Sequence, residues 1–349
     1  CSNSKIHSNP APLHKKKTVS ISATFPPLVK EYFAIPRVHS LNDWRHLRIG
    51  KKLFQEYIAH HGLPDIIHAH SALQGGHLAL LISEAEKIPF VLTEHSSAYA
   101  RKLLRDSELS LSRKIFESAT RLISVSSSLA RDLQNVAPTT SGKWEIIPNS
   151  VDVDYFRSKE VSSPNLKKSF NFLVIAHLNK NKDISNLLQA VKEIEGKADF
   201  RLRIGGAGEE EGNLKKFTAD LGIAKSIDFL GNLSRKEILD EISNADVFIL
   251  PSKYETFGVV LIEALALGKP IIATKCGGPN DIVEPHNGIL VPVGDPKSLS
   301  RAMLDVKKNI DKYSPEYIRK RCIEKFSSSA VSKYLEKLYH ETLNSDRRN

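Results

Sequence analysis

Two carboxylates, Glu255 and Glu263, stand eight positions apart in the segment ETFGVVLIEALALG. The residues between and just after them are mostly apolar or small, and residues 258–267 are apolar on every side. Such a pattern predicts a buried helix. An unpaired ionised carboxylate is very costly to bury, so the Glu263 side chain must have a partner or reach solvent or a cleft. It either faces solvent or pairs with a neighbouring cation, or it faces a cleft and accepts hydrogen bonds from ligand hydroxyls.

The start of this helix has the features of an anion site. Gly258, near the first turn, allows a ligand to approach the backbone closely. The free amide groups and the positive end of the helix dipole favour phosphate there. Two helical turns span about 11 Å, so Glu255 and Glu263 could flank a phosphate and touch different parts of one extended ligand. A ligand with hydroxyls at both ends and a diphosphate between them is a nucleotide sugar.

The pattern E-x7-E within ETFGVVLIEALALGKPIIAT resembles the signature of retaining glycosyltransferases of family 4, which have the GT-B fold. The resemblance runs from about residue 65 to the C-terminal region. It implies an α/β protein with two Rossmann-like, doubly wound domains that face a cleft. It also implies transfer of a sugar from a nucleotide-diphosphate sugar to a hydroxyl, with retention of configuration and without a metal or other cofactor. By the same resemblance Glu255 is a catalytic residue that binds the transferred sugar, and Glu263 binds the ribose.

Further donor-binding residues follow from the resemblance. The backbone amides of Phe257, Gly258 and Val259 are expected to hold the diphosphate. The segment IAHLNKNKD resembles the family pattern G-R-L-x-x-x-K-G, in which Arg and Lys grip the diphosphate. Lys182 matches this pattern, whereas His177 stands in the place of the Arg. A histidine is only partly charged at neutral pH and lacks the two-pronged guanidinium, so a weaker, pH-sensitive grip is expected.

Either of these side chains could instead be a solvated loop residue. Gly231 and Asn232, in FLGN, are placed by the resemblance beside the base, which the backbone would hold.

Three histidines and a carboxylate follow strands of the first half. His68 and His70 flank Ala69, and strand alternation sends both to one face. Two histidines at this spacing could bind a metal, but the neighbouring sequence offers no evident third ligand. The resemblance places His70 beside the transferred sugar, as a second catalytic residue. The last two candidates, Glu94 and His95, follow a strand's carboxyl end, where open α/β sheets place ligands, and are expected on the acceptor side. The alternative for His95 is a capping or core histidine.

Alternating strand and helix patterns position these residues and predict parallel, doubly wound sheets. The expected strands are 18–25, 65–69, 90–93, 121–125, 144–148, 172–175, 201–204, 227–230, 247–251, 270–274 and 288–292. The expected helices are 41–61, 75–87, 110–119, 127–136, 185–194, 208–221, 234–243, 258–267 and 315–343. Residues 1–17 are polar and are expected to be disordered.

We expect an acceptor-side domain at 1–155, a nucleotide-sugar-binding domain at 165–315 and, by the resemblance, C-terminal helices at 316–349 that cross back to the first domain. A hinge is expected at IPNSVDVDYF, where Asp152 and Asp154 form a D-x-D. That pair could bind a metal in another setting, but the resemblance places IPN-x-VD at a domain junction.

The family begins with a strand, a glycine-rich loop and a helix that precede the region seen here, so the first domain is expected to be incomplete. Two alternatives to an active transferase stay open: a truncated, inactive GT-B fragment, and a GT-B nucleotide-sugar epimerase.

Composition narrows the class of partner. The formal net charge is +10, from 50 basic and 40 acidic residues, which attracts phosphates or an anionic membrane face. No nucleic-acid-reading motif stands out, and no apolar run reaches the ~20 residues of a membrane span. The three cysteines lack metal spacing and fit a reducing cytosol. We expect a cytoplasmic enzyme, peripheral on the inner membrane face, that uses a nucleotide sugar and a sugar or lipid-linked acceptor to build a cell-surface polysaccharide or glycolipid.

Overall fold

The computed structural model describes residues 15–21, 28–34, 39–157 and 169–346. Residues 1–14, where disorder was expected, lie outside this part of the chain. The expectation is wrong for residues 15–17, which open a strand. Strands β1 (Lys15–Ile21) and β2 (Leu28–Ala34) form a separate antiparallel pair.

The first parallel sheet has the order β3-β4-β5-β6. Its strands are β3 (Ile67–His70), β4 (Phe90–Glu94), β5 (Arg121–Ser124) and β6 (Trp144–Ile146). The helices of this domain are α1 (His39–His61), α2 (His77–Glu86), α3 (Asp106–Ser118) and α4 (Ser127–Val136). Short helical turns lie at η1 (Ser71–Gly76) and η2 (Pro138–Thr140). Ser126 caps α4 by accepting a hydrogen bond from the amide of Leu129, which fixes where that helix begins.

The second parallel sheet has the order β12-β11-β10-β7-β8-β9. Its strands are β7 (Phe170–Ile175), β8 (Phe200–Gly205), β9 (Ile227–Gly231), β10 (Val247–Leu250), β11 (Ile271–Thr274) and β12 (Gly288–Val291). Its helices are α5 (Ile184–Ile194), α6 (Glu211–Asp220), α7 (Arg235–Asn244), α8 (Val259–Ala266), α9 (Pro279–Ile282) and α10 (Pro296–Lys308), with turns η3 (Ala224–Ser226) and η4 (Ile310–Lys312). The strand order reverses between β7 and β10. In open α/β sheets the crevice at such a switch point is where ligands bind.

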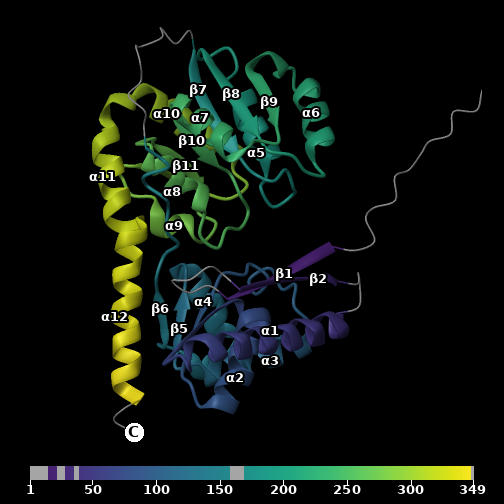
Figure 1. The fold of residues 1–349 in the computed structure, drawn as a ribbon. Helices are drawn as coiled ribbons and strands as arrows, with labels where there is room; N and C mark the ends of the chain where they lie inside the picture. The colour runs from purple at the N-terminus through teal and green to yellow at the C-terminus, as the bar shows by residue number, and fades with distance from the viewer. Residues whose placement is uncertain (1–14, 22–27, 35–38, 158–168, 347–349) are drawn as a thin grey trace, which may run out of the picture.

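Two parallel-sheet α/β domains, one above the other in Figure 1, confirm the Rossmann-like architecture expected from the sequence. Sequence reading missed β2, whose residues LVKEYFA mix charges with apolar residues, and it missed α10. The helix expected to begin at residue 75 is preceded by a π-helical turn, η1.

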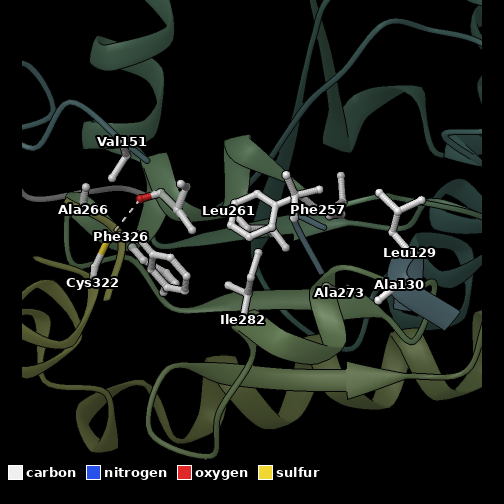
Figure 2. Close-up of a cluster of buried hydrophobic side chains, with 14 of the residues drawn as sticks. Leu129, Ala130, Val151, Phe257, Leu261, Ala266, Ala273, Ile282, Cys322 and Phe326 are labelled. Carbon is white, nitrogen blue, oxygen red and sulfur yellow. Dashed lines mark hydrogen bonds between the residues drawn. The ribbon is translucent and has the colours of Figure 1, made fainter. Parts of the chain in front are cut away.

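Both domains contribute to one apolar cluster. Leu129 and Ala130, from α4 of the first domain, belong to the same buried cluster as Phe257, Ala273 and Ile282 of the second (Figure 2). All of these side chains are buried. The carboxyl edge of the second sheet therefore packs against the first domain at α4.

The C-terminal helices connect the two domains. Helix α11 (Pro315–Phe326) packs against α8, and α12 (Ser328–Asp346) then runs along the first domain (Figure 1). Val331 and Leu338 of α12 are buried against Val91, Ile123 and Ile147 of the first sheet. None of the helices described in the structure is both long and apolar enough to span a bilayer.

Candidate functional site

The loops that follow β7 and β10 meet at the switch point of the second sheet and bring Lys182 to Glu255. The Lys182 ammonium lies 2.6 Å from a carboxylate oxygen of Glu255, with 22% and 18% of the two side chains exposed. The backbone supports this pair, because the amide of Lys253 donates to the carbonyl of Asn181 at 2.8 Å and the Asn181 side chain donates to the carbonyl of Tyr254 at 2.9 Å. Lys182 and Glu255 are 73 residues apart in the sequence, and they meet because β7 and β10 are neighbours in the sheet.

Helix α8 starts directly after this pair. Gly258 has φ +101°, a left-handed conformation that favours glycine, and no side chain caps the helix. The Phe257 side chain is buried in the core, so only its backbone can meet a ligand. Val259 is exposed. A Cβ on Gly278 would lie 2.3 Å from the Phe257 backbone, so the loop after β11 holds the helix start in place only because it carries glycine there. The first amides of α8 have no side-chain cap, and that they hold an anion stays a prediction.

Glu263 lies one to two turns into α8 and is partly buried. Burial raises the pKa of its carboxyl to about 7, and the positive charge of Arg235 offsets part of that rise. Within the part of the chain that the structure describes, no group donates a hydrogen bond to Glu263 or pairs with it within ion-pair distance. The carboxylate is thus partly buried and outside ion-pair distance of a described cation, and that it faces ligand hydroxyls stays a prediction.

The other residues predicted to bind the donor lie on the loops after β7 and β9, which pack closely against the loop after β8. A Cβ on Gly206 would lie 1.9 Å from the carbonyl oxygen of Ala176, and the amide of Gly206 donates to the carbonyl of Gly231 at 2.7 Å. These contacts explain the IGGAG sequence as close backbone approach. Asn232 follows Gly231 and is exposed. The His177 imidazole lies 3.2 Å from the Glu209 carboxylate, and 64% of each side chain is exposed.

The histidines of the first domain form one cluster at the carboxyl ends of β3 and β4. Nδ1 of His70 lies 2.9 Å from Nε2 of His95, and the rings of His68 and His70 stack at 4.5 Å. His68 also bonds to the Thr93 hydroxyl at 2.7 Å and to the Tyr339 hydroxyl at 2.5 Å. His95 is partly buried and its imidazole contacts that of His70, and its role on the acceptor side stays a prediction.

Burial keeps this cluster neutral at physiological pH. It lowers the pKa of His68 to about 3, with smaller contributions from the charges of His70 and His95. The pKa of His95 falls to about 4 for the same main reason, and burial also lowers the pKa of His70. Neutral imidazoles can donate or accept hydrogen bonds at a hydroxyl without attracting an anion.

Glu94 lies at the carboxyl end of β4, as the sequence predicted, but its carboxylate is turned toward the backbone. Its side chain is buried, and its oxygens accept three backbone hydrogen bonds of 2.8 Å from the amides of Ala72, His95 and Ser96. Burial raises the pKa of Glu94, and these amide bonds offset part of the rise. Glu94 therefore holds η1 and the loop after β4 together through its carboxylate, and its place on the acceptor side stays a prediction.

Direct hydrogen bonds join the two domains beside the Glu255 loop. The Asp281 carboxylate accepts bonds of 2.6 Å from both the amide and the hydroxyl of Ser127, at the start of α4. The Tyr254 hydroxyl donates to Asp132 of the same helix at 3.0 Å. These contacts were not predicted, because their partners lie 154 and 122 residues apart. Tyr339 was missed for the same reason.

Other polar groups and cavities lie away from these residues. Asp152 pairs with Arg235 at 3.4 Å and accepts a bond from the amide of Tyr155, so it forms a turn in the linker. Within the described ranges no three His, Cys, Asp or Glu side chains are arranged to hold a metal. A cavity of about 410 Å³ lined by Arg121, Lys143 and Glu341 lies at the amino ends of β5 and β6, opposite the edge that carries the histidines.

Two family models match the chain. The model described as Glycosyltransferase Family 4 matches residues 10–155, and the model described as Glycosyl transferases group 1 matches residues 156–325.

Two curated relatives are similar over most of the chain. A D-inositol 3-phosphate glycosyltransferase of Corynebacterium jeikeium is 30% identical over 308 residues, which cover 79% of this chain and 72% of the relative. The putative teichuronic acid biosynthesis glycosyltransferase TuaC of Bacillus subtilis is 27% identical over 274 residues, which cover 74% of this chain and 65% of the relative. The chain therefore spans about two thirds to three quarters of the length of these relatives.

Solved structures share the fold. Sucrose-phosphate synthase from Thermosynechococcus elongatus has a TM-score of 0.75 at 22% identity, covering 89% of this chain and 81% of that one. HepE from Anabaena has a TM-score of 0.74 at 18% identity, and the match covers 84% of this chain and 82% of HepE.

Proposed function

The chain belongs to the GT-B glycosyltransferases, and from this premise we propose that it is a retaining enzyme that uses a nucleotide-diphosphate sugar as donor. The HepE structures contain UDP or UDP-glucose, which supports a uridine nucleotide as the first donor to test. The reaction breaks the bond between the anomeric carbon and the diphosphate and forms a bond from that carbon to an acceptor hydroxyl. Because the leaving diphosphate gains charge as the bond breaks, fixed positive groups beside it lower the barrier.

The second domain supplies those groups. Lys182, His177 and the uncapped amides at the start of α8 would hold the diphosphate, so the proposed reaction needs no metal. Glu255, already fixed in position by Lys182, would accept hydrogen bonds from hydroxyls of the transferred sugar. Gly231 and Asn232 would lie beside the base. This arrangement achieves catalysis mainly by positioning and by stabilising the leaving group.

The first domain would supply the acceptor side. His70 would lie near the reacting carbon, and its bond to His95 fixes the direction of its ring. A neutral imidazole there can accept or donate a hydrogen bond at a sugar hydroxyl. The relatives named above act on inositol phosphate or in teichuronic acid biosynthesis, which supports a hydroxylated acceptor in cell-surface polysaccharide or glycolipid synthesis. Two buried free thiols, Cys276 and Cys322, fit a cytoplasmic location.

One observation carries the proposal: Glu263 is a partly buried carboxylate without a partner among the described residues, within two turns of an uncapped helix start. A group that costs stability in the free protein is expected where a ligand supplies the missing donors. The ribose hydroxyls of a nucleotide bound through its diphosphate at residues 257–259 would supply them.

Calorimetry with UDP and a panel of UDP-sugars tests the proposal. Wild type is expected to bind, Glu263→Ala to bind at least tenfold more weakly, and Glu255→Gln to bind UDP but fail to transfer sugar. UDP affinity that is unchanged in Glu263→Ala would remove this residue from the ribose site. Sugar-nucleotide isomerisation without an acceptor would instead favour the epimerase, and no nucleotide binding by wild type would favour the inactive fragment.

A further inference from the structure

Among the exposed large apolar side chains of the first domain, Trp44 and Leu103 lie on neighbouring segments whose other large apolar residues are buried or partly buried. Trp44, in α1, is 53% exposed, and Leu103, in the loop Ser97–Arg105 between β4 and α3, is 60% exposed. On the opposite side of α1, Leu53 and Phe54 are buried. Helix α1 thus packs on the domain through buried apolar side chains and exposes Trp44 to solvent near its first turns.

The exposure of Leu103 is imposed by a hydrogen-bonded turn. The amides of Arg101–Leu103 donate to carbonyls of residues 97–99 at 2.9–3.1 Å. Tyr99 anchors the turn in the core, where its hydroxyl bonds to Ser112 at 3.0 Å. Lys102 has φ +52°, a left-handed conformation that costs about 1 kcal/mol for a residue with a side chain. The loop is therefore held in shape with Leu103 pointing outward.

Both segments are basic. Helix α1 contains four lysines and arginines against two carboxylates, and the loop Ser97–Arg105 contains three against none. The exposed basic side chains of the two segments are Arg48, Lys51, Lys52, Arg101, Lys102 and Arg105. Arg48 lies 5.2 Å from the Trp44 ring, over its face. This arrangement of cation and aromatic ring is stable at the surface and leaves both groups accessible.

The two segments adjoin. Helices α1 and α3 both pack against α2. The pKa of Arg105 is raised, chiefly by its hydrogen bond and ion pair with Glu108 and in smaller part by the carboxylate of Asp43, the neighbour of Trp44. The start of α1 and the loop before α3 therefore form one surface, which we call the α1–loop surface. Figure 1 shows α1 well apart from the sheet of the second domain.

We propose that the α1–loop surface docks on a bilayer that contains anionic lipids. Exposed tryptophan and leucine side chains enter the headgroup boundary, and lysines and arginines around them are attracted to anionic headgroups. Only two apolar side chains are exposed here, set among six cations, which fits a charged lipid surface better than the apolar centre of a protein interface.

This docking goes beyond the proposed function, and only its link to the acceptor rests on that function. The loop Ser97–Arg105 begins two residues after His95. A bilayer on this surface would therefore lie next to the acceptor side. An acceptor attached to lipid would be presented there without leaving the membrane.

Vesicle sedimentation tests the proposal on the full chain. Wild type is expected to bind vesicles of phosphatidylglycerol and phosphatidylcholine and not pure phosphatidylcholine. Changing Arg48, Lys51 and Lys52 together to serine is expected to lower partitioning about hundredfold, from about fivefold for each basic residue. The matched control changes three exposed lysines of the second domain to serine: Lys216, Lys225 and Lys308. Thermal unfolding confirms that both triple variants are folded.

Tryptophan fluorescence gives a second readout. The chain has two tryptophans, and Trp144 is buried with only 8% of its surface exposed. Anionic vesicles are expected to shift the emission of wild type to shorter wavelength and to leave Trp44→Phe unshifted, since Trp144 already lies in the core.

Equal loss of binding in the two triple variants would show that net charge alone drives binding, and would overturn the proposal. So would binding without a Trp44 shift, no binding to anionic vesicles, or tighter binding to soluble polyphosphate than to vesicles. UDP affinity measured on the same variants is expected to be unchanged. If vesicles bind while wild type binds no nucleotide, the proposed function fails and the docking surface stands.

Discussion

Replacing Glu263 with glutamine removes a charge that the free protein has no partner for among its described residues, while keeping the shape of the side chain. The variant is therefore expected to be more stable than wild type at neutral and alkaline pH. A carboxyl whose pKa is about 7 in the folded protein and 4.5 in the unfolded chain opposes folding by about 3.5 kcal/mol once it is ionised, at about 1.4 kcal/mol per pKa unit. Since the side chain is partly exposed, screening reduces this, and we expect about 1–2 kcal/mol.

The difference in stability between Glu263→Gln and wild type is expected to depend on pH. Below pH 4.5 the carboxyl is neutral in both states and the two proteins are expected to be equally stable. As the pH rises from 4.5 to 7, the unfolded chain ionises first, so wild type loses stability relative to Glu263→Gln. Above pH 7 the difference is expected to stay constant.

Urea denaturation at pH 5 and pH 8 measures this difference. The control is Glu336→Gln on α12, where the carboxylate is exposed and equal stability is expected at both values. A Glu263→Gln variant that is no more stable than wild type at pH 8, or equally stabilised at pH 5, would refute the view that burial without a partner strains this residue. A variant that gains stability and loses UDP affinity would show that the strain serves binding.

His177→Arg is expected to tighten UDP binding about 5- to 30-fold, because a guanidinium adds a two-pronged, charge-assisted bond worth about 1–2 kcal/mol; calorimetry measures this, and an unchanged Kd would mean that the side chain does not reach the diphosphate. Tyr339→Phe removes the hydroxyl that bonds to His68, and leaving that ring nitrogen unpaired is expected to cost about 1–2 kcal/mol in urea denaturation; an unchanged midpoint would contradict this. Asp281→Asn is expected to weaken the bonds to Ser127 by about 1 kcal/mol and to increase the radius of gyration in small-angle scattering; an unchanged radius would show that other contacts hold the domains together.

Regular local patterns made much of the fold predictable. β10 reads as a short apolar run because it is buried on both sides, and α4 begins after Ser126 because that residue caps it. Glu255 and Lys182 were each singled out through a family pattern, and the strand order gives the physical reason that the two meet.

What could not be predicted depends on contacts between distant segments. A carboxylate at a strand end looks the same in sequence whether it faces a ligand or, like Glu94, is surrounded by backbone amides. The partner of His68 stands 271 residues later in the chain. β2 was missed because its pairing with β1, rather than its own periodicity, makes it a strand. The π-helical turn after His70 requires glycine at position 75, because a Cβ there would lie 2.6 Å from the His70 carbonyl oxygen. Gly75 is therefore a feature of the sequence that reflects this turn.

The position of α12 has a consequence for how the protein is made. Val91, Ile123 and Ile147 are synthesised before the second domain, whereas Val331 and Leu338 of α12, which cover them, are synthesised after it. Nascent chains therefore carry a bare sheet face throughout synthesis of the second domain, a state that invites chaperone capture or aggregation. Premature termination before α12 would leave this apolar face of the first domain exposed to water.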